Sequence, residues 1–135
     1  MYDKELVVDI LKKLDIAIDV IVKRTESIHE PNDFLTSWMG TLILDGVCMK
    51  LTALGESIKN LDKITNKELL SQYPEIPWRG VMGTRDIIAH HYFDVDAFEI
   101  FSICKNDLVP LQVTIKKMIS DLEESRDNMT HTVNI

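Results

Sequence analysis

Residues 3–28 read DKELVVDILKKLDIAIDVIVKRTESI, and this stretch decides the fold class of the chain. Its apolar side chains recur at steps of three, four and seven residues, with lysine and aspartate between them, which is the period of an amphipathic helix. Additional apolar positions widen the stripe beyond one face, so the helix needs more than one neighbour, within the domain or in a second subunit. The two sets are Leu6, Ile10, Leu14, Ala17, Ile21 and Ile28, and then Val7, Val8, Leu11, Ile18 and Val22.

Further helices follow, separated by proline and by polar capping residues. Pro31 ends the first pattern, and Asn32 or Asp33 is expected to cap a second helix over residues 34–60. Glycines inside that helix indicate close packing of a neighbouring helix, or a bend. Downstream we expect a connection over residues 62–76 that contains a short helix at 66–73 capped by Asn66. A third helix should follow with Pro77 in its first turn. A fourth helix, capped by Asp94 or Asp96, should run through Cys104, and a fifth should cover 107–124 with Asn106 as its cap.

Composition agrees with an all-α fold. The chain has 135 residues, only five glycines and four prolines, and no strand-like alternation or internal repeat. Scarce turn residues favour long helices over many short strands. The sequence therefore predicts an antiparallel bundle of about five helices in one domain over residues 1–126, with a polar, flexible tail over 127–135.

The net charge of −7 bounds the partners. An acidic surface argues against tight, sequence-blind binding of long nucleic acid, which depends on neutralising phosphates. It leaves room for a local basic cleft built from Lys50, Lys59, Arg79 and Arg85, although these cations could equally be a solvated helix surface. No signal peptide and no apolar run of membrane-spanning length is apparent, so we expect a cytoplasmic protein without a membrane partner.

The two cysteines and the acidic residues offer little to a metal. Cys48 and Cys104 lack metal-ligand spacing and lie among apolar residues, which predicts buried free thiols. His90, His91, Asp94 and Asp96 could be drawn as a site, but the two aspartates are better explained as helix caps. No zinc or two-carboxylate spacing is present, and the sequence predicts neither a metal nor another cofactor.

The segment GTRDIIAHHY over residues 83–92 carries the chemistry. Arg85 offers a rigid fork of donors that matches a phosphate, and His90 is suited to moving a proton near neutral pH. On a regular helix Tyr92 falls on nearly the same line as Arg85, whereas His90 is roughly 140 degrees away. Convergence therefore needs the helix to end near His90, or a two-fold partner that supplies a second copy.

Each residue also has a purely structural interpretation. Arg85 could pair with a surface carboxylate, His90 could cap helix carbonyls, and Tyr92 could belong to the core. His91 could substitute for His90 or compete with it, and helical geometry alone does not separate the two.

The surrounding sequence, YPEIPWRGVMGTRDIIAHHYFDVD over residues 73–96, resembles the central signature of the HepT-like family of HEPN domains. That family carries an arginine, four residues, a histidine, one residue and a tyrosine, with a polar residue straight after the arginine. Here these positions are Arg85, His90, Tyr92 and Asp86. The Pro77–Trp78 lead-in and the Gly55–Glu56 pair also match, while the segment 108–111, LVPL, is an imperfect counterpart of the family's later motif. The likeness covers roughly residues 50 to 115.

The resemblance implies a homodimeric ribonuclease with a composite site at the dimer interface. It would cleave RNA without a metal and act as the toxin of a toxin–antitoxin pair. His90 would be the general acid or base, Arg85 would hold the scissile phosphate, Asp86 could orient either of them, and Tyr92 could bind the phosphate. The matching tyrosine in the family looks like the residue to which a nucleotidyltransferase antitoxin attaches AMP. The rival interpretation is a non-catalytic helical module that binds a nucleotidyltransferase or a nucleotide, because one fold can serve both roles.

Overall fold

The computed structural model describes residues 2–90 and 94–133, and within these ranges the chain is helical with no strand. The all-α prediction is therefore confirmed. The helices are α1 (Lys4–Arg24), α2 (Trp38–Ile64), α3 (Trp78–His90), α4 (Ala97–Ser102) and α5 (Leu108–Val133). Short 3-10 turns cover Pro31–Phe34 and Leu70–Gln72, and a π-helical turn covers Ile103–Asp107.

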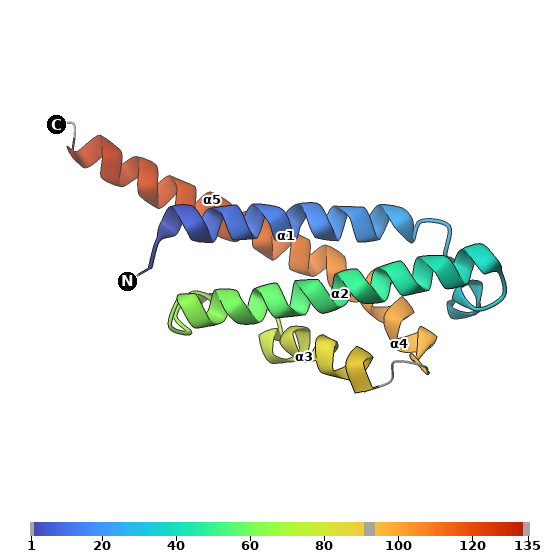
Figure 1. The fold of residues 1–135 in the computed structure, drawn as a ribbon. Coiled ribbons are helices and arrows are strands. Elements are labelled where there is room, and N and C mark those ends of the chain that lie inside the picture. Colours follow the sequence, from blue (N-terminus) through green and yellow to red (C-terminus); the bar gives the residue numbers. More distant parts are fainter. Residues whose placement is uncertain (1, 91–93, 134–135) are drawn as a thin grey trace.

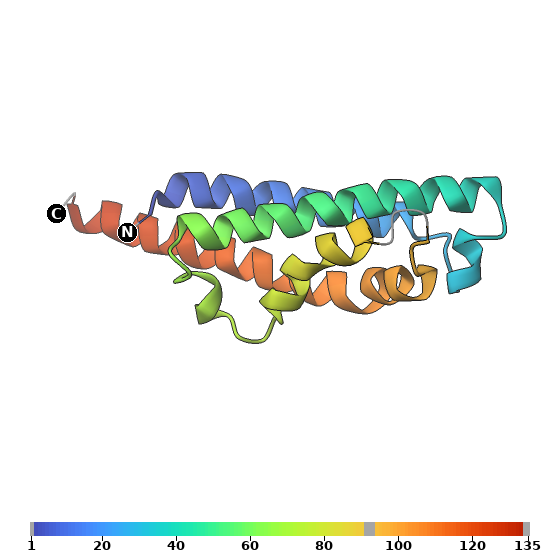
Figure 2. The ribbon, with the colours of Figure 1, turned by 60° about the horizontal axis from the view of Figure 1, so that its bottom comes forward.

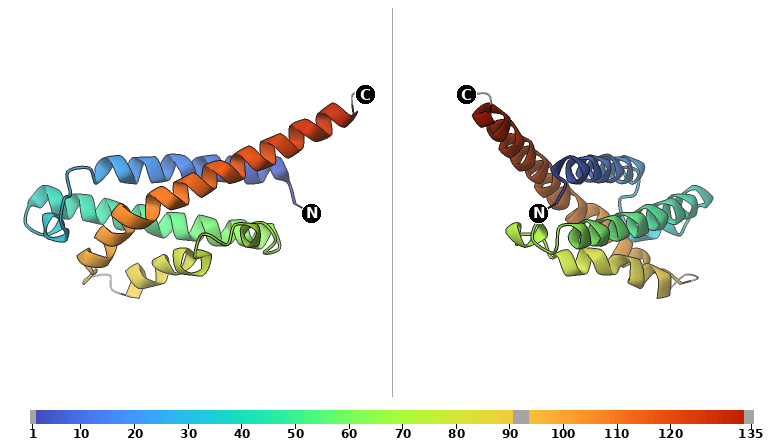
Figure 3. Two further views of the ribbon diagram at one scale, coloured as in Figure 1. Left: turned by 180° about the vertical axis from the view of Figure 1, so that it is seen from behind. Right: turned by 60° about the vertical axis from the view of Figure 1, so that its left-hand side comes forward.

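The long helices lie side by side in alternating directions. Helix α1 packs against both α5 and α2, and α2 carries α3 on its other side (Figure 1). Helices α2 and α3 run in opposite directions, as two views agree (Figure 2). The last part of α5 projects beyond the bundle (Figure 3). None of the helices in the described ranges has the length and apolar character needed to cross a membrane.

The wide apolar stripe of α1 is covered within the chain itself. Its two flanks face α2 and α5, which explains why apolar residues extend beyond a single helical face. The fully buried side chains at the centre come from all three helices: Leu11, Ile18, Ile21, Leu51, Ile58, Leu61, Leu108, Ile115 and Met118.

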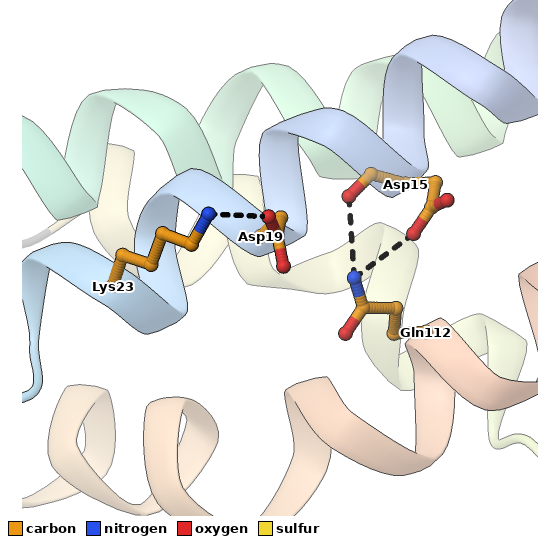
Figure 4. Close-up of polar contacts among 4 residues, drawn as sticks. All are labelled: Asp15, Asp19, Lys23 and Gln112. Carbon is orange, nitrogen blue, oxygen red and sulfur yellow. Dashed lines mark hydrogen bonds and ion pairs between the residues drawn. The ribbon is translucent and has the colours of Figure 1, made fainter.

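Polar contacts set the register between α1 and α5. The side-chain amide of Gln112 donates to the Asp15 carboxylate at 2.9 Å and to the Asp15 carbonyl at 3.4 Å (Figure 4). One turn along α1, Lys23 pairs with Asp19 at 3.1 Å. The amide contact joins residues far apart in the sequence, so it fixes how α5 slides along α1.

The start of α2 differs from the prediction. Neither Asn32 nor Asp33 caps it; the Ser37 hydroxyl accepts from the Gly40 amide at 2.9 Å, so α2 spans residues 38–64 in place of 34–60. The Asp33 carboxylate instead accepts from the backbone amides of His29 and Glu30, at 2.8 and 3.1 Å. These two hydrogen bonds lower the pKa of Asp33, because they stabilise its charged form.

Other predicted boundaries also shift. Helix α1 ends at Arg24, four residues before the predicted end, where the buried Thr25 hydroxyl donates back to the Ile21 carbonyl. In the connection, the predicted helix at 66–73 is reduced to a 3-10 turn over 70–72. Asn66 is no helix cap there, since it adopts a left-handed conformation with φ 54°.

The third helix begins at Trp78, directly after Pro77. The Pro77 carbonyl accepts from the Val81 amide at 3.1 Å, so proline sits where its missing N–H costs no hydrogen bond. The Trp78 indole donates to the Tyr73 carbonyl at 2.9 Å, and the Tyr73 hydroxyl donates to Asp121 of α5 at 2.7 Å. These contacts anchor the start of α3 to the bundle.

The fourth and fifth predicted helices are joined. Asp96 caps α4 as expected, accepting from the amides of Phe98 and Glu99 at 2.9 and 3.3 Å. Asn106 does not cap α5, because it lies inside the π-helical turn and its side chain bonds to Ser102. Helix α4 thus continues through this turn into α5, and the predicted count of about five helices is not established.

The C-terminal segment is helical further than the prediction placed it. Helix α5 runs to Val133, past residue 126, where the sequence predicted the polar tail to begin.

Candidate functional site

Gly55 sets the distance between α2 and α3. A Cβ atom added at this glycine would lie 3.2 Å from the Val81 carbonyl oxygen, 3.5 Å from that of Met82 and 3.8 Å from the Arg85 amide nitrogen. The neighbouring atoms are all backbone, so a side chain at position 55 would push α3 outward. The glycine predicted to mark close helix packing does so here, and it places Arg85 directly beside α2.

Arg85 is held by the residue that follows this glycine. Its Nε lies 2.8 Å from a carboxylate oxygen of Glu56, with the two side chains 47% and 53% exposed. Such an exposed pair contributes only about 0–1 kcal/mol to stability. The contact therefore matters chiefly because it orients the guanidinium. Glu56 contacts Nε, and the two terminal nitrogens of the guanidinium carry the further N–H donors with which an arginine binds phosphate.

An open hollow of about 800 Å³ begins at this ion pair and follows the second half of α2. We call it the basic hollow, because four cations and two carboxylates line it. The charged residues on its wall are Glu56, Lys59, Asp62, Lys63, Lys67 and Arg85.

The predicted basic cleft is thus only partly the observed one. Lys59 and Arg85 line the basic hollow together, whereas Lys50 lines a separate hollow between α1 and α2, and Arg79 lies on the exposed surface of α3 outside the basic hollow. Lys63 and Lys67, which the sequence analysis did not single out, complete it. Lys59 and Lys63 are one helical turn apart on α2, a spacing that could have revealed them.

The histidine predicted to be catalytic stands at the end of α3. His90 is the last residue of this helix, and its side chain lies outside the described part of the structure, as do residues 91–93, which include His91 and Tyr92. Asp86 is exposed on α3 beside Arg85. The structure therefore places Arg85 and the backbone of His90, and leaves the roles of the other predicted residues as predictions.

The course of α3 is compatible with both arrangements that would bring Arg85 and His90 together. The helix continues through His90, so Arg85 and His90 leave its axis roughly 140 degrees apart and about 7.5 Å apart along it. Because α3 runs opposite to α2, it points from the second half of α2 toward the first half (Figure 1). His90 is the last residue of α3 as described.

The first half of α2 carries large apolar side chains that are exposed. Trp38 is 76% and Met49 is 75% exposed, and Leu42 is also exposed. On a regular helix these three residues and Glu56 fall within about 40 degrees of one another. We call Trp38, Leu42 and Met49 the α2 stripe. This face of α2 thus carries the α2 stripe in its first half, interrupted by the exposed Asp45, and charged residues from Glu56 onward.

The cysteines take no part in this site. Both thiols are free, with Cys104 buried and Cys48 half-buried. Burial raises the pKa of Cys48 to about 11 and that of Cys104 to about 12, so neither is a thiolate near neutral pH. In the described part of the chain no three histidine, cysteine, aspartate or glutamate side chains gather in a metal-binding cluster.

Comparison with known proteins points to one family. The model of the HepT-like family, described as ribonuclease HepT-like, matches residues 14–118. A protein of Methanocaldococcus jannaschii named "Gamma-glutamylcyclotransferase and putative RNase" is 31% identical over 112 residues, which are 83% of this chain and 47% of that protein. A "Probable ribonuclease HepT" of Thermococcus cleftensis is 32% identical over 72 residues, 53% of this chain and 62% of that protein.

These relatives are longer than the matched region. A "Putative RNase" of M. jannaschii is 32% identical over 82 residues, which are 61% of this chain and 64% of that protein. The chain therefore spans between 47% and 64% of the length of these two M. jannaschii relatives. No solved structure matches the chain.

Proposed function

We infer that this chain, which belongs to the HepT-like ribonuclease family, is an RNA endonuclease centred on Arg85 and His90. The observation that carries the proposal is the placement of Arg85. Glu56 orients it at the edge of a basic hollow, and His90 ends the same helix. Together they supply the two functions that cleavage of an RNA phosphodiester requires: charge stabilisation and proton transfer.

The proposed reaction uses the RNA's own hydroxyl as nucleophile. The 2′-oxygen attacks the adjacent phosphorus and loses its proton to a base, while the bond to the 5′-oxygen breaks and that oxygen takes a proton from an acid. The products are a 2′,3′-cyclic phosphate and a 5′-hydroxyl. His90 moves one of these protons, a role that typically contributes 10²–10⁴-fold in rate. Arg85 holds the phosphate and offsets the charge that develops on its oxygens. No step calls for a metal.

The remaining motif residues support this centre. Asp86 orients Arg85 or His90 by a charge-assisted hydrogen bond. Tyr92 hydrogen-bonds the phosphate, and His91 either assists His90 or is a bystander. These assignments rest on the match to the family motif.

The site is proposed to be completed by a second copy of the chain. We propose that a partner covers the α2 stripe across a two-fold axis and brings a second His90 close to the first. Burial of the stripe in a dimer would also explain why such large apolar side chains are exposed in the single chain. This arrangement removes the obstacle of the roughly 140-degree divergence along one helix.

The cellular role that follows is that of a toxin neutralised by a nucleotidyltransferase. That partner would transfer AMP from ATP to the Tyr92 hydroxyl and release pyrophosphate. The added AMP would occupy the cleft and block RNA. Loss of AMP attachment in Tyr92→Phe, with attachment retained in Tyr73→Phe, is the expected outcome when each variant is incubated with the enzyme and labelled ATP.

Cleavage of a labelled RNA pool in EDTA tests the catalytic proposal. The wild type should leave cyclic phosphate ends, whereas Arg85→Ala and His90→Ala should each lose at least 10²-fold in rate. Arg79→Ala is the matched control, since it removes an exposed arginine from the same helix outside the basic hollow. Equal rates for all four proteins would refute the nuclease and favour a binding module. Activity abolished by EDTA and restored by Mg²⁺ would refute the metal-free reaction.

Two experiments test the dimer. Sedimentation at micromolar concentration should show a dimer for the wild type and a monomer for Met49→Glu, with Val113→Glu as the control at an exposed apolar position on α5. Mixing the inactive Arg85→Ala and His90→Ala proteins should restore up to about a quarter of the activity, because half of random dimers are mixed and each has one intact site. A wild-type monomer would refute the composite site.

A further inference from the structure

We propose that the basic hollow binds the single-stranded RNA backbone next to the scissile phosphate, through Lys59, Lys63 and Lys67. The proposal rests on the nuclease function above and names the subsite that this function needs. Arg85 forms one end of the hollow, so phosphates seated in it belong to the strand that Arg85 holds.

The charge of the hollow is opposite to that of the chain. Four cations and two carboxylates give its wall a charge of +2, whereas the whole chain carries −7. Lys59, Lys63 and Lys67 are exposed, and within the described ranges none of them forms an ion pair with a carboxylate. Unpaired positive charge concentrated in one hollow attracts phosphate there. The acidic charge of the rest of the chain disfavours nucleic acid elsewhere on the surface.

The backbone at the end of α2 brings the third lysine to the hollow. Asn66 and Lys67 both have left-handed conformations, with φ of 54° and 63°. The Lys67 amide donates to the Asp62 carbonyl at 2.8 Å, which closes the helix end and turns the chain back. Glycine is the residue that adopts this conformation at least cost. Lys67 therefore adopts this conformation at some cost, and the turn places its side chain in the lining of the hollow.

The layout fits a strand better than a compact nucleotide. Lys59 and Lys63 are separated by about 6 Å along α2, and Lys67 continues the row beyond the helix end. Point charges in a row suit successive phosphates. A single nucleotide would favour converging amides at a helix N-terminus, whereas this hollow offers separate side-chain cations along the second half of α2.

The salt dependence of RNA binding tests the proposal. Fluorescein-labelled single-stranded RNA is titrated in EDTA with His90→Ala protein, which cannot cut it, and with the same protein carrying Lys59→Gln, Lys63→Gln and Lys67→Gln. Each lost phosphate contact lowers the slope of log affinity against log salt by about 0.7, so the triple variant should lose about 2. At 0.1 M salt this corresponds to roughly 100-fold weaker binding.

The matched control carries Lys13→Gln, Lys23→Gln and Lys116→Gln, which change the net charge equally on the exposed surfaces of α1 and α5. Its slope should stay within about 0.5 of the parent, since it loses no phosphate contact. Equal slopes for the two triple variants would overturn the proposal. The role of the lysines would then be to stabilise the C-terminal end of α2 through the helix dipole. AMP alone binding as tightly as a ten-nucleotide RNA would also overturn it, in favour of a nucleotide site.

Kinetics separate this proposal from the nuclease itself. In the otherwise wild-type protein, the three hollow substitutions should raise KM for RNA at least tenfold and leave kcat unchanged, because they remove binding common to ground and transition states. A protein that never cuts RNA but shows the slope difference would refute the nuclease alone. A protein that cuts RNA with unchanged slope and KM would refute the binding subsite alone.

Discussion

Replacing Gly55 with alanine should destabilise the protein even though alanine is the better helix former. In a helix interior the substitution normally gains about 1 kcal/mol. Here the new Cβ would lie 3.2 Å from the Val81 carbonyl oxygen, so α3 must move by a few tenths of an ångström. Overpacking of this kind costs typically about 1–3 kcal/mol. The net loss should therefore be about 0–2 kcal/mol.

Gly46 lies on the same helix and supplies the control, because a Cβ added there would meet no neighbouring atom within 4 Å. Gly46→Ala should be stabilised by about 1 kcal/mol, which separates the two variants by about 1–3 kcal/mol. For a chain of this length that is a difference of roughly 3–12 °C in Tm, measurable by circular dichroism. Equal stabilisation of both variants would show that α3 does not approach Gly55 closely.

The same variant should lose activity out of proportion to its stability. The Arg85 amide lies 3.8 Å from the added Cβ, so α3 carries the arginine outward as it moves. A 1 Å misplacement can cost about 10²-fold in rate, and a few tenths should cost about threefold to tenfold. The assay is RNA cleavage well below Tm. Full activity in a destabilised Gly55→Ala protein would mean that this contact does not position Arg85.

Three further outcomes are expected. Glu56→Gln should change the free energy of unfolding by less than about 0.5 kcal/mol, as for other surface ion pairs. It should nevertheless lower kcat several-fold, because Arg85 loses the charge that orients it. An unchanged kcat would show that the ion pair has only a structural role. The pKa of Asp33 is lowered by backbone hydrogen bonds, so its contribution is present above the unfolded pKa of about 3.9 and disappears as pH falls through the lower folded value. Urea titrations should show a smaller acid loss for Asp33→Asn, and identical pH profiles would contradict this. Burial raises the pKa of Cys104 to about 12, so iodoacetamide at pH 8 should label it only in urea, and rapid labelling of the native protein would place it at the surface.

Sequence periodicity was sufficient to predict the long helices but not their ends. Asn32, Asp33 and Ser37 are all good helix caps, and local propensity does not choose among them. The choice follows from Phe34, which is completely buried and is carried inward by the 3-10 turn that contains it. The Asp33 carboxylate then accepts from the amides before the turn, and the Ser37 hydroxyl caps α2. Tertiary packing decided this boundary.

The junction of α4 and α5 shows a second limit. Asn106 is a plausible cap by composition, but the chain remains helical through a wider turn at residues 103–107. A proline ring at position 110 would press on the carbonyl four residues earlier, at Asn106, and widening the preceding turn relieves that pressure. A proline near a predicted helix start can therefore equally mark a π-helical turn inside a longer helix.

For the candidate site, the sequence reveals the part of the motif that is local and not the contacts that depend on packing. The spacing of Arg85 and His90 is visible in one segment, whereas the pairing of Arg85 with Glu56 requires α2 and α3 to meet at Gly55. Lys67 joins the hollow only through a left-handed turn that no propensity favours for lysine. Both features combine residues separated by a helix or a turn, which a pattern within one window does not reveal.

The position of Glu56 explains why an acidic protein would need the neighbouring lysines. A carboxylate 2.8 Å from Arg85 fixes the guanidinium, but it also stands close to any phosphate that the arginine binds. Like charges at such distances repel, so orientation by Glu56 alone would weaken RNA binding while improving its geometry. Lys59 and Lys63, one and two turns further along α2, supply compensating positive charge without competing for the same fork. Orientation and affinity are thus assigned to different residues, which is why Glu56→Gln and the lysine substitutions should change kcat and KM separately.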